Sequence, residues 1–241
     1  MDNLVFVHGF LGGGAQWAEQ VTSFSSKFKV VTPDLPGFGS KHGMAAPDRI
    51  QHFADAVLAE LDGIGVTRFH LVGHSMGGMI VQEMVAIAPE RVDNLVLYGT
   101  GPVGLLPGRF ESIEVSKRRA SEEGVEATSA RIATTWFVEG KKANGYQLCA
   151  GLGANVLLQT VLAGLSAMES WSGQATLSDI KSRALILCGD GDRTYPWSQT
   201  ESLWNGISNA GLAVVPASAH MVHLEKPEIF NALLMDFLSN L

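Results

Sequence analysis

Short apolar runs alternate with helix-like repeats along most of this 241-residue chain. In the helix-like stretches an apolar residue returns every three or four positions, as at Ile50, Phe53, Val57 and Leu61. The apolar runs predict six strands, at residues 4–8, 29–33, 68–72, 92–98, 184–188 and 212–216. Parallel strands that are buried on both faces have this continuous apolar character. The alternation therefore predicts an α/β fold with a mostly parallel sheet and helices on both faces.

The alternation stops between about residue 100 and residue 178, where strand-like runs are scarce. We therefore expect an α/β core made of residues 1–100 and 179–241, with a helical cap or lid inserted at residues 101–178. The lid should cover the carboxyl ends of the strands, where open α/β sheets bind ligands. Residues 143–168 carry no charge, but their glycines and amides disfavour a membrane span. An apolar stretch of this kind is equally compatible with a pocket wall and with the interface of a homodimer.

The charge balance limits the partners of this chain. Lys and Arg number 17 against 24 Asp and Glu, and the formal net charge is −7. This balance argues against nucleic-acid binding, which needs a cationic face, so we expect a small-molecule substrate. The two cysteines, Cys149 and Cys188, show neither metal-ligand spacing nor a disulfide framework. Together with the absence of a signal-like N-terminal segment, this pattern predicts a cytoplasmic protein.

The strongest local motif is G-x-S-x-G at residues 73–77, directly after an apolar run and before a helical repeat. Small residues on both sides of Ser75 allow a sharp, strained strand-to-helix turn that exposes the serine hydroxyl. The hydroxyl would then lie at the N-terminus of a helix, which favours developing negative charge. An ordinary glycine-rich turn is the simpler interpretation, but the strand–turn–helix context favours a nucleophile.

A serine hydroxyl needs a base, and an imidazole base needs an anionic partner. Among the seven histidines, His220 follows the last predicted strand and precedes the final helix, with His223 as its rival. The strand at residues 184–188 is followed by two carboxylates, Asp190 and Asp192. Spacing alone does not decide between them, because either could cap a polar turn instead.

At this point the chain resembles the α/β-hydrolase superfamily through motifs that occur in the family's order. They are His8-Gly9-Phe10 followed by Gly12-Gly13-Gly14, the loop Asp34-Leu35-Pro36-Gly37-Phe38-Gly39-Ser40, the elbow Gly73–Gly77, the acid loop Gly189 to Pro196, and the histidine loop His220 to Pro227. The resemblance covers essentially the whole chain except the insertion. It implies an α/β-hydrolase fold, here lacking the N-terminal hairpin that family members usually carry.

The resemblance also implies the site residues. It selects Ser75, Asp192 and His220 as the catalytic triad, in the family's Ser…Asp…His order. It assigns the oxyanion hole to the backbone N–H groups of Phe10 and Met76. The implied reaction is hydrolysis of a small carboxylic ester, enol-lactone or amide through an acyl-enzyme, with no metal or organic cofactor.

Two alternatives stay open beside this prediction. The first is a C–C bond hydrolase of a vinylogous diketone, although those relatives commonly carry Asn before the serine and Trp after the histidine, where this chain has His74 and Met221. The second is a non-hydrolytic member of the fold, such as a lyase, a perhydrolase or a ligand receptor. Candidate substrate-binding residues, for which core packing is an equal alternative, are Trp136, Leu157, Val161, Arg193, Tyr195 and Met221.

Overall fold

Six strands form one sheet in the order β2-β1-β3-β4-β5-β6, and every neighbouring pair is parallel. The computed structural model describes residues 1–106 and 111–239. The strands are β1 (Asn3–Val7), β2 (Lys29–Val31), β3 (Phe69–His74), β4 (Val92–Tyr98), β5 (Arg183–Gly189) and β6 (Ala210–Val215). The six predicted strands and the mostly parallel sheet are confirmed, with strand ends that differ from the prediction by at most two residues.

Helices fill the connections between the strands. The α-helices are α1 (Ala18–Phe24), α2 (Ile50–Gly63), α3 (Met76–Ile87), α4 (Ile113–Glu123), α5 (Val125–Thr134), α6 (Tyr146–Ala154), α7 (Leu158–Glu169), α8 (Trp197–Gly206), α9 (Val222–Glu225) and α10 (Pro227–Ser239). The 3₁₀ helices are η1 (Gly14–Trp17), η2 (Gly39–Lys41), η3 (Pro89–Arg91), η4 (Gly140–Lys142) and η5 (Gln174–Asp179). Pro227 begins α10, where a missing N–H leaves no unpaired donor.

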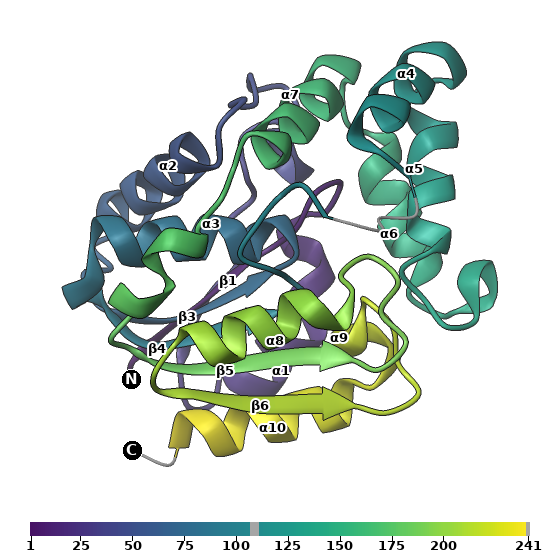
Figure 1. Ribbon diagram of the computed structural model, residues 1–241. Helices are drawn as coiled ribbons and strands as arrows, with labels where there is room; N and C mark the ends of the chain where they lie inside the picture. Colours follow the sequence, from purple (N-terminus) through teal and green to yellow (C-terminus); the bar gives the residue numbers. More distant parts are fainter. Residues whose placement is uncertain (107–110, 240–241) are drawn as a thin grey trace.

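The sheet is covered on both faces (Figure 1). Side chains alternate between the two faces along each strand, so Leu95 and Leu97 of β4 join one apolar cluster while Val96 and Tyr98 join the other. The first cluster includes side chains of α2, α3 and α8, and the second includes side chains of α1 and α10. Burial on both faces explains why the central strands are mostly apolar.

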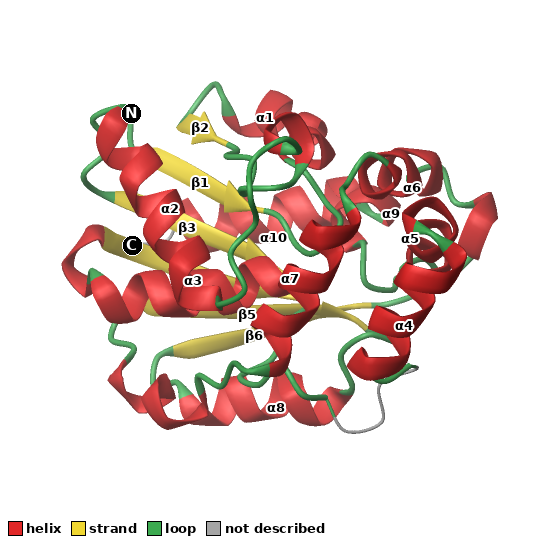
Figure 2. Cartoon of the chain, turned by 90° about the horizontal axis from the view of Figure 1, so that it is seen from above, coloured by secondary structure: helices red, strands yellow, loops and turns green. Residues whose placement is uncertain are grey.

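Residues 99–182, which we call the β4–β5 segment, contain α4, α5, α6 and α7. In Figures 1 and 2 α4, α5 and α6 lie beyond the arrowheads of the strands, and α7 crosses towards α2 and α3. The segment therefore lies at the carboxyl edge of the sheet; its role as a separate lid stays a prediction. Of the described helices, none alone has the length and apolar character to cross a membrane, and α6 and α7 reach that threshold only as a pair bent by 107°.

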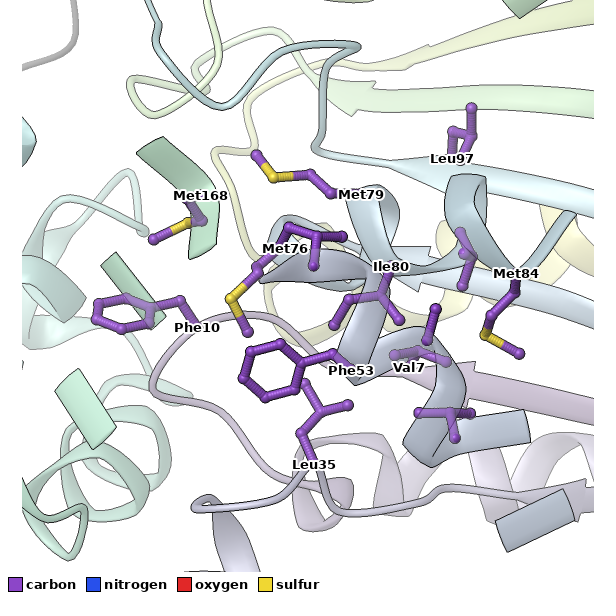
Figure 3. Packing of buried hydrophobic residues seen from close by; sticks show 14 of the residues in the cluster. Val7, Phe10, Leu35, Phe53, Met76, Met79, Ile80, Met84, Leu97 and Met168 are labelled. Carbon is purple, nitrogen blue, oxygen red and sulfur yellow. The ribbon is translucent and has the colours of Figure 1, made fainter. Parts of the chain in front are cut away.

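The order of the strands fixes where loops can form a site. β1 pairs with β2 on one side and β3 on the other, so the connections diverge between β1 and β3. Open α/β sheets bind ligands in the crevice at such a switch point. Figure 3 shows the apolar cluster beside α3 continuing from Met84 through Met76 to Phe10 and Met168 at this edge.

Candidate active site

Ser75 lies in the turn between β3 and α3 with a backbone φ of 57°. A positive φ is strained for a residue that carries a Cβ. A Cβ on Gly73 would overlap the Gly77 carbonyl, and a Cβ on Gly77 would overlap the Val7 carbonyl. Glycine at both positions therefore lets α3 approach β1 and β3 closely enough to form this turn.

Hydrogen bonds tie this turn to the neighbouring strand end. The Ser75 amide donates to the Tyr98 carbonyl oxygen at 3.0 Å, and the Thr100 hydroxyl donates to the Ser75 carbonyl oxygen at 2.8 Å. A Cβ on Gly9 would lie 2.8 Å from the Ser75 Cβ, so the loop after β1 rests directly against the serine. The strained turn is thus held from two sides.

Asp192 and His220 come together at the ends of β5 and β6. The Nδ1 atom of His220 lies 2.9 Å from Oδ2 of Asp192, and the two side chains are only 1% and 3% exposed. The other carboxylate oxygen of Asp192 accepts the amides of Thr194 and Tyr195, at 2.7 and 3.2 Å. Asp190 is exposed and its carboxylate receives the Ser218 amide at 3.4 Å. The geometry therefore separates the two carboxylates that spacing left open.

Four other histidines have different surroundings. His223 is fully buried, its ring lies 4.3 Å from the Trp17 ring, and burial lowers its pKa to about 3. His8 braces two loops, because its Nδ1 bonds the Gly9 carbonyl oxygen and its Nε2 accepts the Leu35 amide. Burial lowers the pKa of His8 to about 4, so this ring is neutral at pH 7. His42 and His52 are exposed.

The predicted oxyanion hole consists of the backbone amides of Met76 and Phe10. Met76 is the first residue of α3, and amides of the first helical turn have no acceptor within their own helix. Phe10 is in the loop after β1, next to Leu11, whose φ is 58°. The two residues follow β1 and β3, the strands that flank the switch point. Their assignment to an oxyanion remains a prediction.

A small pocket of about 30 Å³ includes Ser75 in its wall. Its described lining residues are Phe10, Ser75, Gly104, Leu106, Ile132, Trp136, Met168, Thr194 and Tyr195. The rings of Trp136 and Tyr195 also lie 6.0 and 5.8 Å from the His220 ring, measured between centroids. The serine, the imidazole and these aromatic rings therefore share one site. None of the described lining residues is charged.

The predicted substrate-binding residues divide into three groups. Trp136 and Tyr195 line the pocket. Leu157 is 42% exposed and Arg193 is exposed, outside the pocket wall as described. Val161 and Met221 are 0% and 2% exposed and belong to the apolar cluster. Contact of any of these residues with a substrate stays a prediction.

Three basic side chains of the β4–β5 segment pair with carboxylates of the same segment. Arg119 and Arg131 both pair with the buried carboxylate of Glu111, at 2.9 and 2.6 Å. Lys117 pairs with Glu169 at 2.6 Å, so this part of α4 is held to α7. Arg109 lies outside the described residues.

Sequence reasoning missed Leu106, Ile132 and Thr194 in the pocket wall. Leu106 and Ile132 come from the β4–β5 segment, where apolar periodicity does not reveal which face meets the sheet. Thr194 carried a detectable signal, because it follows the proposed acid by two positions in the loop after β5. Among the described residues, no group of three or more His, Cys, Asp or Glu side chains is arranged to hold a metal ion.

Glu225 joins the β4–β5 segment to the loop that carries His220. One oxygen of its carboxylate accepts the Val138 amide at 2.8 Å, and the other accepts the Ala219 amide at 2.6 Å. The Met221 amide also donates to the Trp136 carbonyl oxygen at 3.2 Å. A hollow of about 420 Å³ at this junction is lined partly by Val138 and Glu225 and does not include Ser75.

The fold is that of α/β hydrolases, and the chain belongs to that family: the model of the alpha/beta hydrolase fold matches residues 2–227. Its relatives are hydrolases, so the protein is a hydrolytic enzyme of this fold.

Two relatives with similar sequences cover 98% of this chain. RutD of Pseudomonas syringae pv. syringae (strain B728a), which bears the name of a carbamate hydrolase, is 28% identical, and the match covers 93% of its length. The 2-hydroxy-6-oxo-6-phenylhexa-2,4-dienoate hydrolase of Burkholderia cepacia is 26% identical and is covered to 87%.

Solved structures show the same fold. A thermophilic esterase from Thermogutta terrifontis superposes with a TM-score of 0.90 at 21% identity, over 99% of this chain and 90% of that one. The enol-lactonase from Burkholderia xenovorans LB400 superposes with a TM-score of 0.87 at 22% identity, over 100% of this chain and 93% of that one.

Proposed function

We propose that this protein is a serine hydrolase that cleaves a small carboxylic ester, enol-lactone or amide through an acyl-enzyme. The observation that carries the proposal is the buried Asp192–His220 pair, which shares its site with Ser75 on a strained turn. A carboxylate that bonds Nδ1 fixes the imidazole tautomer with Nε2 available as a base. Nothing in the packing of the core requires a serine, an imidazole and a carboxylate to meet at three separate strand ends.

The proposed mechanism assigns one role to each of these groups. Ser75 Oγ attacks the substrate carbonyl carbon while Nε2 of His220 takes its proton, and Asp192 stabilises the imidazolium that forms. The amides of Phe10 and Met76 bind the oxyanion, and each such donor contributes about 2.7–4 kcal/mol in comparable enzymes. The imidazolium then protonates the leaving group. In the second half of the reaction, His220 activates a water molecule, which attacks the acyl-enzyme and releases the acid product.

The pocket supports a small, uncharged acyl group. Its volume of only about 30 Å³ favours a small group over a long chain, and no described lining residue is charged. The folds of an esterase and of an enol-lactonase are among those that match this chain.

C–C bond hydrolysis is the second candidate, because a dienoate hydrolase is 26% identical over nearly the whole chain. This chain departs from the features expected of that group at His74 and Met221. A substrate panel of acetyl and butyryl esters, enol-lactones, amides, carbamates and vinylogous diketones separates the candidates. Preference for the diketones by kcat/KM would replace the ester assignment with the C–C assignment.

Ser75→Ala tests the nucleophile, with Ser121→Ala on the exposed face of α4 as a matched control. Removal of a triad serine lowers kcat by about 10³-fold or more, so we expect Ser75→Ala to lose turnover and labelling by a fluorophosphonate. The Ser121→Ala variant should keep both. Wild-type turnover in Ser75→Ala on the preferred substrate would overturn the proposal.

A further inference from the structure

Two buried side chains bind the main-chain carbonyl oxygen of His220. The Tyr98 hydroxyl donates to it at 2.9 Å, and Nε2 of His74 lies 3.0 Å from it. Tyr98, His74 and His220 are exposed by 0%, 1% and 1%. Tyr98 ends β4 and His74 ends β3, so two adjacent strand ends hold the loop that carries the proposed base.

The acceptor decides where the protons lie in this network. A carbonyl oxygen only accepts, so His74 carries its proton on Nε2, and the single Tyr98 proton points to the same oxygen. Nδ1 of His223 lies 3.0 Å from the Tyr98 oxygen and must then be the donor in that contact. The His223 amide donates to the same oxygen at 3.2 Å. The hydrogen bonds of this network are therefore all directed towards the His220 carbonyl oxygen, either directly or through the Tyr98 hydroxyl.

Burial keeps both donors in these forms. Desolvation, reinforced by the neighbouring rings of His220 and His223, holds the pKa of His74 well below its ordinary value, so its ring is neutral. Desolvation raises the pKa of Tyr98 well above its ordinary value, so its hydroxyl keeps its proton. A neutral His74 matters because its ring centroid is 4.5 Å from that of His220. A charged ring there would repel an imidazolium.

We propose that Tyr98 and His74 are positioning residues that anchor the main chain of His220, so that its imidazole stays aligned between Asp192 and Ser75. This inference rests on the proposed function for the role of Ser75. His220 lies in the loop between β6 and α9, outside any helix or strand. A catalytic side chain on a loop depends on such supporting bonds, and a displacement of about 1 Å can lower a rate by about 10²-fold.

Tyr98→Phe is the sharpest test, because it removes one oxygen atom. Its control is Tyr146→Phe in α6, since the Tyr146 hydroxyl also donates to a main-chain carbonyl, that of Ala130, but lines no part of the Ser75 pocket. We expect Tyr98→Phe to lower kcat about tenfold per fluorophosphonate-titrated site, with KM within about twofold. The proton NMR signal of the His220 Nδ1–H bonded to Asp192 should also shift or broaden. Tyr146→Phe should leave kcat and this signal unchanged.

A second pair of variants tests His74. In His74→Gln the side-chain amide can reach the position of Nε2 and still donate to the His220 carbonyl, whereas His74→Leu provides no donor. We expect His74→Leu to lower kcat and alter the NMR signal as Tyr98→Phe does, and His74→Gln to restore much of both. This comparison also serves if Tyr98→Phe does not fold.

The readouts separate this inference from the proposed function. Unchanged kcat and an unchanged Nδ1–H signal in Tyr98→Phe, or in His74→Leu, would overturn the positioning role. Loss of thermal stability alone, with both readouts preserved, would also overturn it. If Ser75→Ala kept full activity, the nucleophile assignment would fail, while the NMR signal would still decide whether Tyr98 and His74 hold His220.

Discussion

The strand ends of the sheet and the β4–β5 segment build the same site in different ways. The strand ends hold their polar groups by short, buried hydrogen bonds, as between Asp192 and His220 or between Tyr98 and His220. The segment adds large apolar side chains to the pocket wall, including Leu106, Ile132 and Trp136. Such side chains affect a substrate through the shape of the pocket. The proposed reacting groups are thus fixed by hydrogen-bond direction, while we expect the fit of the substrate to depend on packing. Substitutions in the two regions should therefore affect different measurements.

The largest effect should come from the carboxylate at the end of β5. We expect Asp192→Asn to lower kcat by about 10⁴-fold, because an amide there stabilises neither the tautomer nor the imidazolium. Asp190→Asn, two residues away and exposed, is the matched control and should stay within about twofold. Steady-state kinetics on the preferred ester would check both. Equal losses in the two variants would show that the loop, and not the carboxylate, matters.

Acid should destabilise the sheet region through its buried histidines. The folded pKa of His8 is about 4 against an ordinary value of 6.5, so the unfolded chain binds more protons between these values. Stability is then complete above about pH 6.5 and falls as the pH drops towards 4, by about 3 kcal/mol from this group. Urea unfolding at several pH values between 4 and 7 would measure how the free energy of unfolding depends on pH.

His8→Gln offers the control, since its amide can accept the Leu35 N–H but does not titrate. If the free energy of unfolding of this variant depended on pH as strongly as that of the unmodified chain, His8 would not be the source of the acid response. The β4–β5 segment contains no histidine, so this acid response should originate in the sheet region.

Acyl selectivity should respond to the segment. Met168 of α7 lines the pocket, and Met168→Ala should raise kcat/KM for butyryl over acetyl esters by about tenfold, since each accommodated methylene contributes about 1–3 kcal/mol. Leu158→Ala at the exposed start of the same helix is the control and should leave the ratio unchanged. An unaltered ratio in Met168→Ala would place the acyl group elsewhere.

The smallest effects should distinguish two glycines within the segment. A Cβ on Gly164 of α7 would lie 2.9 Å from the Phe10 ring, whereas a Cβ on Gly151 of α6 would meet nothing within 4 Å. We expect Gly151→Ala to stabilise the protein by about 0.5–1 kcal/mol through helix propensity, and Gly164→Ala to destabilise it by about 1 kcal/mol or more. Chemical unfolding of both variants would test the difference. Equal stabilisation would show that α7 does not press on the loop after β1.

The sheet was predictable because its burial leaves a direct mark on the sequence. The strand at Val92–Tyr98 has the same bounds in the prediction and in the structure, and its second half, Leu95 to Tyr98, is apolar on both faces. β2 ends two residues earlier than expected, at Val31, because Thr32 and Pro33 leave the sheet edge, and proline has no N–H to donate to a ladder.

The site was only partly predictable. The strand ends limited the proposed acid to Asp190 or Asp192, and only the family resemblance selected Asp192. Spacing could not make this choice, because it depends on which carboxylate turns inward in the folded loop. The pocket wall depends on how four helices pack over the sheet, so Ile132 lines it while Leu157 is exposed, although both have apolar neighbours in sequence. The support of His220 by Tyr98 joins residues 122 positions apart and leaves no local pattern.

The attachment made by Glu225 has an evolutionary consequence. Its carboxylate recognises main-chain amides, at Val138 on one side and Ala219 on the other, and an amide is present at these positions whatever non-proline side chain they carry. The side chains of the helical segment can therefore change during evolution, and the specificity of the site with them, while the hydrogen bonds of Glu225 to these two amides are kept.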